Sequence, residues 1–101
     1  MDEMTVAIRL VELAIKKGYY VSVFDGEEYT VVKSQNVSLI TGALNTTGED
    51  RLSLYNNGTL FGAIWLVWGN SLDELISDYS GRSDWEMDNF IKQHESICGF
   101  K

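Results

Sequence analysis

The sequence predicts an α+β domain with a twisted, mainly antiparallel sheet of about five strands and three helices. Three observations predict this class. Asp25-Gly26 and Asn57-Gly58 each separate short runs rich in β-branched and aromatic residues, which is the pattern of a β-hairpin. Amphipathic helical patterns occupy both ends of the chain. Between them, residues 60–68 are almost wholly apolar, which is typical of a buried strand.

The chain has 101 residues, of which 45% are apolar and 12% aromatic. A chain of this length and composition forms one domain, residues 1–101, and buries a core without disulfides or metals. The predicted order of elements is helix, strand, strand, helix, strand, strand, strand, helix.

The first helix is predicted to begin at a cap on Asp2 or Thr5 and to end near Lys17. Gly18 then suits the left-handed position that ends a helix. Its apolar residues recur at helical spacing and form a wide stripe, which consists of Val6, Ile8, Leu10, Val11, Leu13, Ala14 and Ile15.

Two strands, residues 19–24 and 28–33, follow the first helix. Asp25-Gly26 readily takes the positive φ angles of a two-residue turn, so the strands are predicted to form a hairpin. One face of this hairpin is partly polar, as expected away from the centre of a sheet.

Ser34 or Asn36 is placed to cap a shorter second helix, which ends near Leu44. A strand over residues 51–55 follows, and residues 56–59 form the second hairpin turn. In that strand the leucines alternate with polar residues, so they are expected to point inward; they are Leu52 and Leu54.

The apolar run 60–68 is predicted to be the central strand. A buried helical segment is the alternative, but the aromatic content and the turn signals at both ends favour a strand. Neither face is polar, so this strand is expected to be covered on both sides. One face carries Leu60, Gly62, Ile64, Leu66 and Trp68, and the other carries Phe61, Ala63, Trp65 and Val67.

Residues 71–80 fit two patterns. Apolar residues fall at helical spacing, and Ser71 with Glu74 resembles a capping box. The interpretation favoured here is a strand from Leu75 to Tyr79 that returns beside the central one. In that strand Leu75, Ser77 and Tyr79 would share one face, with Ile76 and Asp78 on the other.

The last helix is predicted between Ser83 and Gly99. Ser83 and Glu86 have the spacing of a capping box, and Gly99 suits the C-terminal stop. The apolar edge of this helix is formed by Met87, Phe90, Ile91 and His94.

The net charge of −7 and the pI near 4.5 argue against direct nucleic-acid binding, which needs cations to neutralise phosphates. The N-terminal residues do not form a signal peptide, and no apolar run is long enough to cross a bilayer. A single cysteine excludes an internal disulfide. The expected location is therefore the cytosol. No glycine-rich phosphate-binding motif occurs, so no cofactor is expected.

His94 and Cys98 are the best candidates for catalysis, since a helix places residues four apart on one face. A Cys–His pair can generate a nucleophilic thiolate, with Asp78 or Glu95 as an orienting third group. These two residues are too few for a structural zinc site, which needs four ligands. Asp25, Glu27 and Glu28 crowd one turn, but a divalent-ion site needs more oxygen ligands, so a solvated turn is the preferred interpretation. An enzyme is consequently the last-ranked hypothesis, and no catalytic or metal site is predicted.

Several stretches of the chain resemble a group of small acidic proteins encoded by bacteriophages and prophages. They are Val21–Glu28, Val32–Ser34, Ala43–Leu44, Thr47–Leu52, Trp68–Asn70 and Ile76–Ser80. The group is expected to have Tyr where this chain has Trp68, and its variants at residues 75–79 favour a strand there. The resemblance implies a phage origin and a location in the host cytosol. It carries no catalytic motif.

These observations predict a small phage accessory protein that works by binding a host or phage protein. Its acidic surface would steer it to a basic partner, such as a nucleic-acid-binding protein that it inhibits by imitating DNA. Two of the three tryptophans are expected in the core, and Trp68 is expected to be partly exposed. The predicted partner-binding residues are Trp68, Asp73, Glu74, Asp78, Asp84, Glu86 and Asp88.

The alternative function is that of a structural, homo-oligomeric phage protein without an inhibitory role. Three short helices do not cover both faces of a five-stranded sheet, and an apolar remainder marks an interface. A homodimer is therefore expected.

Overall fold

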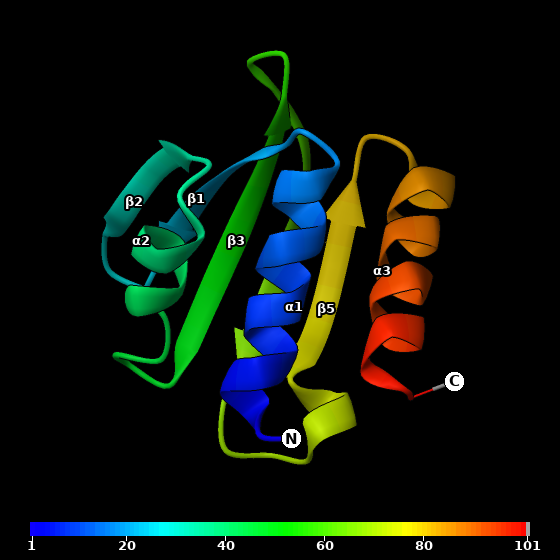
Figure 1. Cartoon of the computed structure of the whole chain (residues 1–101). Coiled ribbons are helices and arrows are strands. Elements are labelled where there is room, and N and C mark those ends of the chain that lie inside the picture. The colour runs from blue at the N-terminus through cyan, green and yellow to red at the C-terminus, as the bar shows by residue number, and fades with distance from the viewer. Residues whose placement is uncertain (101) are drawn as a thin grey trace.

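The structure is a computed structural model that describes residues 1–100. Within these residues the chain forms one five-stranded antiparallel sheet with three α-helices on one of its faces (Figure 1), so the predicted α+β class and order of elements are confirmed. The strands are β1 (Tyr20–Phe24), β2 (Tyr29–Ser34), β3 (Glu49–Asn56), β4 (Thr59–Val67) and β5 (Ile76–Gly81). The helices are α1 (Glu3–Lys16), α2 (Val37–Gly42) and α3 (Asp84–Cys98), with a short 3₁₀ turn, η1 (Leu72–Glu74).

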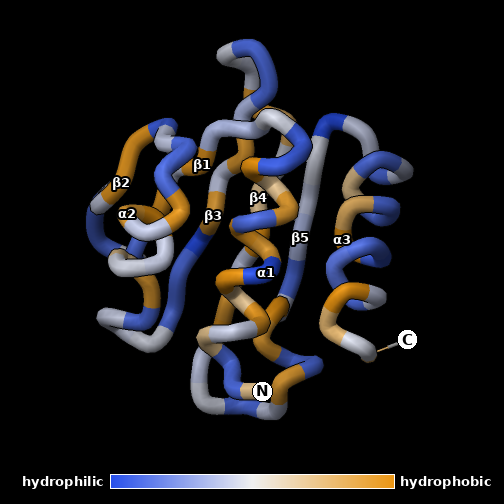
Figure 2. Tube along the Cα trace, viewed as in Figure 1, coloured by the Kyte–Doolittle hydropathy of each residue, from blue (hydrophilic) through white to orange (hydrophobic). Residues whose placement is uncertain are grey.

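Each α-helix begins at a polar side chain that accepts a hydrogen bond from the first turn. Thr5 N–H donates to Asp2 Oδ1 at 2.8 Å, which decides between the two expected caps of α1. Asn36 caps α2 and Ser83 caps α3 in the same way. At the far end of α3, Gly99 has a φ of +80°, as expected for a left-handed stop. Figure 2 shows apolar and polar residues alternating along α1 and α3, the pattern of helices that lie with one side on a sheet.

The β1–β2 hairpin has a longer loop than the predicted two-residue turn. Asp25 N–H donates to the carbonyl of Glu28 at 3.0 Å, and the strands end at Phe24 and begin again at Tyr29. Asp25 also accepts the backbone N–H groups of Glu27 and Glu28 on one carboxylate oxygen. These bonds lower the pKa of Asp25 and hold a wider turn than Asp-Gly alone would make.

The apolar run 60–68 forms a strand, β4, but the strand is not central. The order across the sheet is β2-β1-β3-β4-β5, so β3 lies in the middle and β4 lies next to the edge. The helices cover only one face of the sheet (Figure 1), and the expectation that β4 is covered on both sides is wrong. Alternation places Leu52 and Leu54 of β3 on the covered face, where they are buried as predicted.

A bulge in β4 changes the expected division of its side chains. The register shifts between the pairs Leu54–Gly62 and Tyr55–Leu60, which leaves Phe61 as the extra residue. Phe61 consequently turns to the helix side, where its ring stacks on Tyr19 at 4.7 Å between centroids.

β5 pairs with β4, so the favoured strand interpretation of residues 75–79 is confirmed, while Ser71 and Glu74 frame the 3₁₀ turn before it. A second register shift sets Ile76 opposite Leu66 and Tyr79 opposite Ile64. Ile76 and Tyr79 therefore share the helix-facing side. The predicted faces of this strand were wrong because strict alternation does not foresee a bulge.

The core lies between the helices and the covered face of the sheet. It is contributed mainly by α1, α3 and the three middle strands, with Ile40 from α2 and Val31 from the edge strand β2. In the part of the chain that the structure describes, no helix has the length and apolarity needed to span a membrane.

Candidate functional site

The C-terminal third of the protein carries most of its excess negative charge. Residues 71–100 contain seven carboxylates and only two cationic side chains, Arg82 and Lys92. The structure distributes these carboxylates over η1, β5 and α3, which lie side by side at one edge of the molecule (Figure 1). We call this region the acidic edge; its carboxylates are Asp73, Glu74, Asp78, Asp84, Glu86, Asp88 and Glu95.

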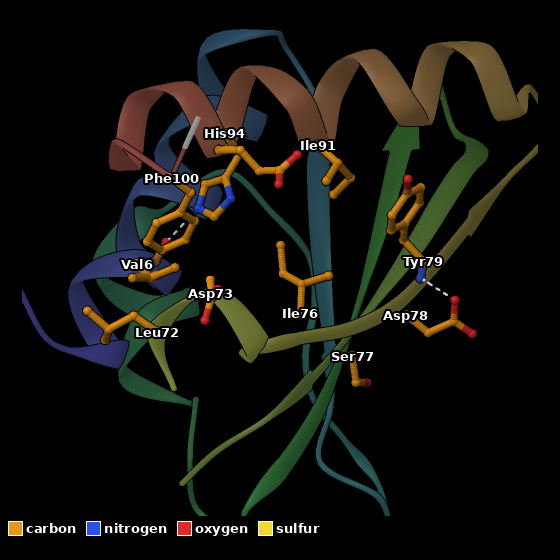
Figure 3. A pocket seen from close by; sticks show the side chains of 11 residues that line it. Val6, Leu72, Asp73, Ile76, Ser77, Asp78, Tyr79, Ile91, His94 and Phe100 are labelled. Atoms are coloured by element: carbon orange, nitrogen blue, oxygen red, sulfur yellow. Dashed lines mark hydrogen bonds between the residues drawn. The ribbon is translucent and has the colours of Figure 1, made fainter. Parts of the chain in front are cut away.

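A groove of about 280 Å³ opens between β5 and α3 within the acidic edge. Figure 3 shows α3 contributing His94 and Ile91 from one side, while β5 contributes Ile76 and Tyr79 from the other. The groove combines an apolar wall with polar groups. Its lining consists of Val6, Leu72, Asp73, Ile76, Ser77, Asp78, Tyr79, Ile91, His94, Glu95 and Phe100.

Three carboxylates line this groove, and two of them were predicted as partner-binding residues: Asp73 and Asp78. Asp78 accepts the N–H of Tyr79 at 2.8 Å, and Figure 3 shows its side chain turned away from the middle of the groove. The third, Glu95, was predicted only as a catalytic partner. Its position four residues after Ile91 was the signal, because helical spacing puts both on the same face of α3.

Asp88 joins α3 to β5 beyond the groove. The hydroxyl of Tyr79 donates to Asp88 Oδ1 at 2.6 Å. This hydrogen bond, with a smaller contribution from burial, raises the pKa of Tyr79 to about 12. Asp88 is therefore a structural acceptor as well as part of the acidic edge.

The other predicted carboxylates lie outside the groove. Ser71 Oγ donates to Glu74 Oε1 at 2.8 Å, so Glu74 closes the 3₁₀ turn. Asp84 and Glu86 are exposed in the first turn of α3, where negative side chains suit the positive end of the helix dipole.

The tryptophans differ from expectation. The indole N–H of Trp68 donates to Asp50 Oδ2 at 2.8 Å, and its ring packs against the core. Trp85, expected in the core, is 73% exposed, since it sits on the solvent side of the first turn of α3. Trp65 is half-buried on the uncovered face of the sheet. Trp68 is half-buried, so the prediction that it is partly exposed is confirmed, but Trp85 is far more exposed than expected.

Asp50, which holds Trp68, is only 3% exposed. Its Oδ2 also accepts the N–H of Asn45 at 2.8 Å, while its Oδ1 has no partner. Desolvation raises the pKa of Asp50, against the opposing effect of its two hydrogen bonds. The carboxylate thus ties the loop before β3 to the end of β4.

His94 and Cys98 are brought together as predicted, with Sγ 3.4 Å from Nε2. His94 Nε2 lies 2.9 Å from the carbonyl oxygen of Val6, so this nitrogen carries the proton and donates. Burial raises the pKa of Cys98 and lowers the pKa of His94. Both shifts favour the uncharged forms, whereas an activated Cys–His pair requires a thiolate and an imidazolium.

The uncovered face of the sheet is the second candidate surface. Its middle row across four strands consists of small residues, Ser22, Ser53, Ala63 and Ser80. The next row places Phe24, Arg51, Trp65 and Asp78 side by side. The guanidinium of Arg51 lies 4.7 Å from the centre of the Phe24 ring and donates to the hydroxyl of Tyr29. A hollow of about 330 Å³ lies along this row.

Among residues 1–100, no three or more His, Cys, Asp or Glu side chains cluster closely enough to hold a metal ion. Comparison of the chain with protein-family models, with curated proteins and with solved structures gives no match.

Proposed function

We propose that this chain is a small phage accessory protein that acts in the host cytosol, without catalysis, by binding a basic protein surface through its acidic edge. The observation that carries the proposal is the concentration of seven carboxylates against two cations on adjacent elements, where three of the carboxylates line a groove with an apolar wall. Such a surface steers a cationic partner into encounter and gives specificity. The resemblance of six stretches to small phage proteins supports the origin.

In the sharper form of the proposal, the partner is a nucleic-acid-binding protein and the acidic edge imitates the phosphates of DNA. Proteins of that class carry cation clusters arranged to meet rows of negative charge. Asp84, Glu86 and Asp88 continue the acidic edge along α3 beyond the groove.

Trp85 takes the place of Trp68 as the apolar anchor of this surface. It lies between Asp84 and Glu86 in the chain and exposes most of its ring. Exposed tryptophans are enriched among the residues that contribute most to binding energy. Replacing Trp85 by Ala is therefore expected to weaken partner binding while leaving the fold intact.

Affinity capture from a host lysate at low and moderate salt tests the proposal. The tagged wild-type protein should recover a specific basic protein, and recovery should fall as salt screens the charges. The variant carrying Asp84→Asn, Glu86→Gln and Asp88→Asn should lose most of that recovery. Each substitution removes a charge but keeps a hydrogen-bond acceptor, so the bond from Tyr79 to residue 88 can persist.

The matched control carries Glu12→Gln, Glu27→Gln and Glu28→Gln. These three side chains are exposed on α1 and in the β1–β2 turn. Their replacement changes the net charge by the same amount as the triple substitution in α3. If both triple variants lose the same recovery, only net charge matters. If neither loses any, the carboxylates of α3 do not contact the partner, and the form of the proposal in which they imitate DNA is wrong.

The uncovered sheet face favours a second candidate, a homodimer. Four large apolar side chains of the strands that form this face are exposed: Tyr20, Tyr29, Val32 and Leu60. In one row Arg51 and Asp78 flank Trp65 on adjacent strands. A two-fold axis along β4 would therefore set Arg51 of one copy opposite Asp78 of the other, which is a self-complementary arrangement.

Sedimentation at micromolar concentration distinguishes this candidate. A dimer that uses the uncovered face should dissociate when Trp65 is replaced by Ser, while Trp85→Ser should leave it intact. A single species of 11.4 kDa in the wild type would end the homodimer hypothesis.

A further inference from the structure

The strongest unexplained feature of the groove is a buried nitrogen atom with no partner. His94 is 1% exposed, and its Nε2–H donates to the carbonyl of Val6. Because Nε2 carries the proton of the neutral ring, Nδ1 must be the acceptor, and no group of residues 1–100 donates to it. A buried acceptor left without a donor destabilises the folded state, so a ligand that supplies the donor gains binding energy there.

The ring of His94 stays neutral at physiological pH. Burial, with a smaller contribution from the positive charge of Arg9, lowers its pKa and outweighs the hydrogen bond to Val6 and the neighbouring carboxylate of Glu95. A neutral imidazole does not repel a cation, and its free nitrogen is a ready acceptor for one. Figure 3 shows the ring projecting from α3 into the groove, with its second nitrogen toward Ile76 and Ile91.

The rest of the groove provides what a long cationic side chain needs. Ile76, Ile91 and Phe100 offer apolar contact for a hydrocarbon stem. Asp73 and Glu95 offer carboxylates for the charged head. A volume of about 280 Å³ accommodates one such side chain and not a folded peptide.

We propose that the groove receives a single arginine or lysine side chain of the partner, whose N–H groups donate to His94 Nδ1 and to the carboxylates of Glu95 and Asp73. This inference rests on the proposed function and names the chemistry that the acidic edge recognises. Nδ1 is buried among the residues that line the groove, so some of these side chains must shift for a guanidinium to reach it. Arginine fits better than lysine, since its planar fork reaches more than one acceptor.

Titration of the full chain with Nα-acetyl-arginine amide, followed by nitrogen NMR of the imidazole, tests the inference without any partner. His94 is the only histidine in the sequence, so its ring signals need no further assignment. The Nδ1 resonance should shift saturably as the nitrogen gains a donor, together with the backbone amides of Ile76 and Ile91. Nα-acetyl-lysine amide should produce the same pattern with weaker affinity.

Two controls test whether binding requires the charge of the probe and the carboxylates of the groove. Nα-acetyl-citrulline amide has nearly the shape of the arginine probe but no charge, and it should bind at least about tenfold more weakly. The variant with Asp73→Asn and Glu95→Gln should also weaken arginine binding by at least about tenfold. The matched variant with Glu12→Gln and Glu28→Gln should bind as the wild type does.

Three results would overturn the inference: no saturable shift at Nδ1, equal binding of the citrulline probe, or equal weakening in both pairs of variants. These outcomes are independent of the lysate experiment. A groove that binds arginine while no basic protein is captured would contradict the proposed function alone. Capture through Asp84 and Glu86 with an unresponsive Nδ1 would contradict the inference alone.

Discussion

The two faces of the sheet are built from the same strands but differ in burial and in function. On the covered face, Leu52, Leu54, Ile64 and Leu66 are almost completely buried under the helices. On the uncovered face, neighbouring positions carry Ser53, Ala63 and Tyr55, with Arg51 and Trp65 beyond them. Alternation along β3 and β4 thus separates a face that holds the fold together from one that is free to contact another molecule. Stability measurements on neighbouring residues can test this division.

The largest effect is expected at Gly62, where the covered face leaves no room for a side chain. A Cβ at this position would lie 2.7 Å from Met87 Sδ and 2.7 Å from the carbonyl oxygen of Ser80. Gly62→Val should therefore destabilise the protein by about 3 kcal/mol or more, since backbone of β5 would have to move. Ala63→Val, one residue on and on the uncovered face, should cost less than about 1 kcal/mol in the same urea titration. Equal costs would contradict the division.

A second comparison uses Leu54 and Tyr55 of β3. Leu54→Ala empties a buried position and should lower the free energy of unfolding by about 3 kcal/mol. Tyr55→Ala removes a half-buried ring and its contact with the Lys33 ammonium, 4.8 Å from the ring centre, and should cost about 1 kcal/mol. If Tyr55→Ala costs as much as Leu54→Ala and the unfolding midpoint depends on protein concentration, the uncovered face is buried in a dimer.

Asp50 is the polar exception at the end of the covered face, opposite Leu66 in the register. Burial raises its pKa, so the folded protein binds this proton more tightly than the unfolded chain, whose Asp pKa is 3.8. The stability contributed by this group is complete below pH 3.8 and is lost as pH rises through the raised value. As the pH rises above 3.8, Asp50→Asn should therefore become progressively more stable relative to the wild type. Parallel pH profiles of the two proteins would contradict this expectation.

The smallest effect is expected for Tyr79→Phe, which removes the hydrogen bond to Asp88 between β5 and α3. The change should cost about 1 kcal/mol in chemical denaturation. Tyr55→Phe removes the same hydroxyl from the uncovered face, where it should alter stability by less than half as much. A larger loss at Tyr55 than at Tyr79 would show that the Asp88 contact adds nothing.

Local signals in the sequence were sufficient for most of the fold. Asp2, Asn36, Ser83 and Gly99 define helix ends through hydrogen bonds with residues a few positions away, and such bonds are readable from spacing. The order of strands in the sheet was not predicted correctly. The apolarity of residues 60–68 predicts a central strand, but strand order depends on which hairpins pair with one another, which is a long-range property.

The candidate site was also predicted only in part, because some of its features are local and others depend on long-range contacts. The acidic composition of residues 71–100 and the His94–Cys98 spacing were visible in the sequence. The groove was not, because it arises where β5 meets α3 and where a bulge turns Ile76 toward the helix. The exposure of Trp85 was readable from helical spacing, because the residues three, four and seven positions later are polar: Asp88, Asn89 and Lys92.

The irregular edges of the sheet have a consequence for growth of this protein into larger assemblies. β2 has two register shifts against β1, and Lys33 within it has a φ of +45°. At the opposite edge, β5 carries another shift and runs beside α3 (Figure 1). Bent edges of this kind offer a poor template for a further strand. The molecule can therefore leave one broad sheet surface open to solvent without polymerising into fibrils, even at the high concentrations reached when many copies are made at once.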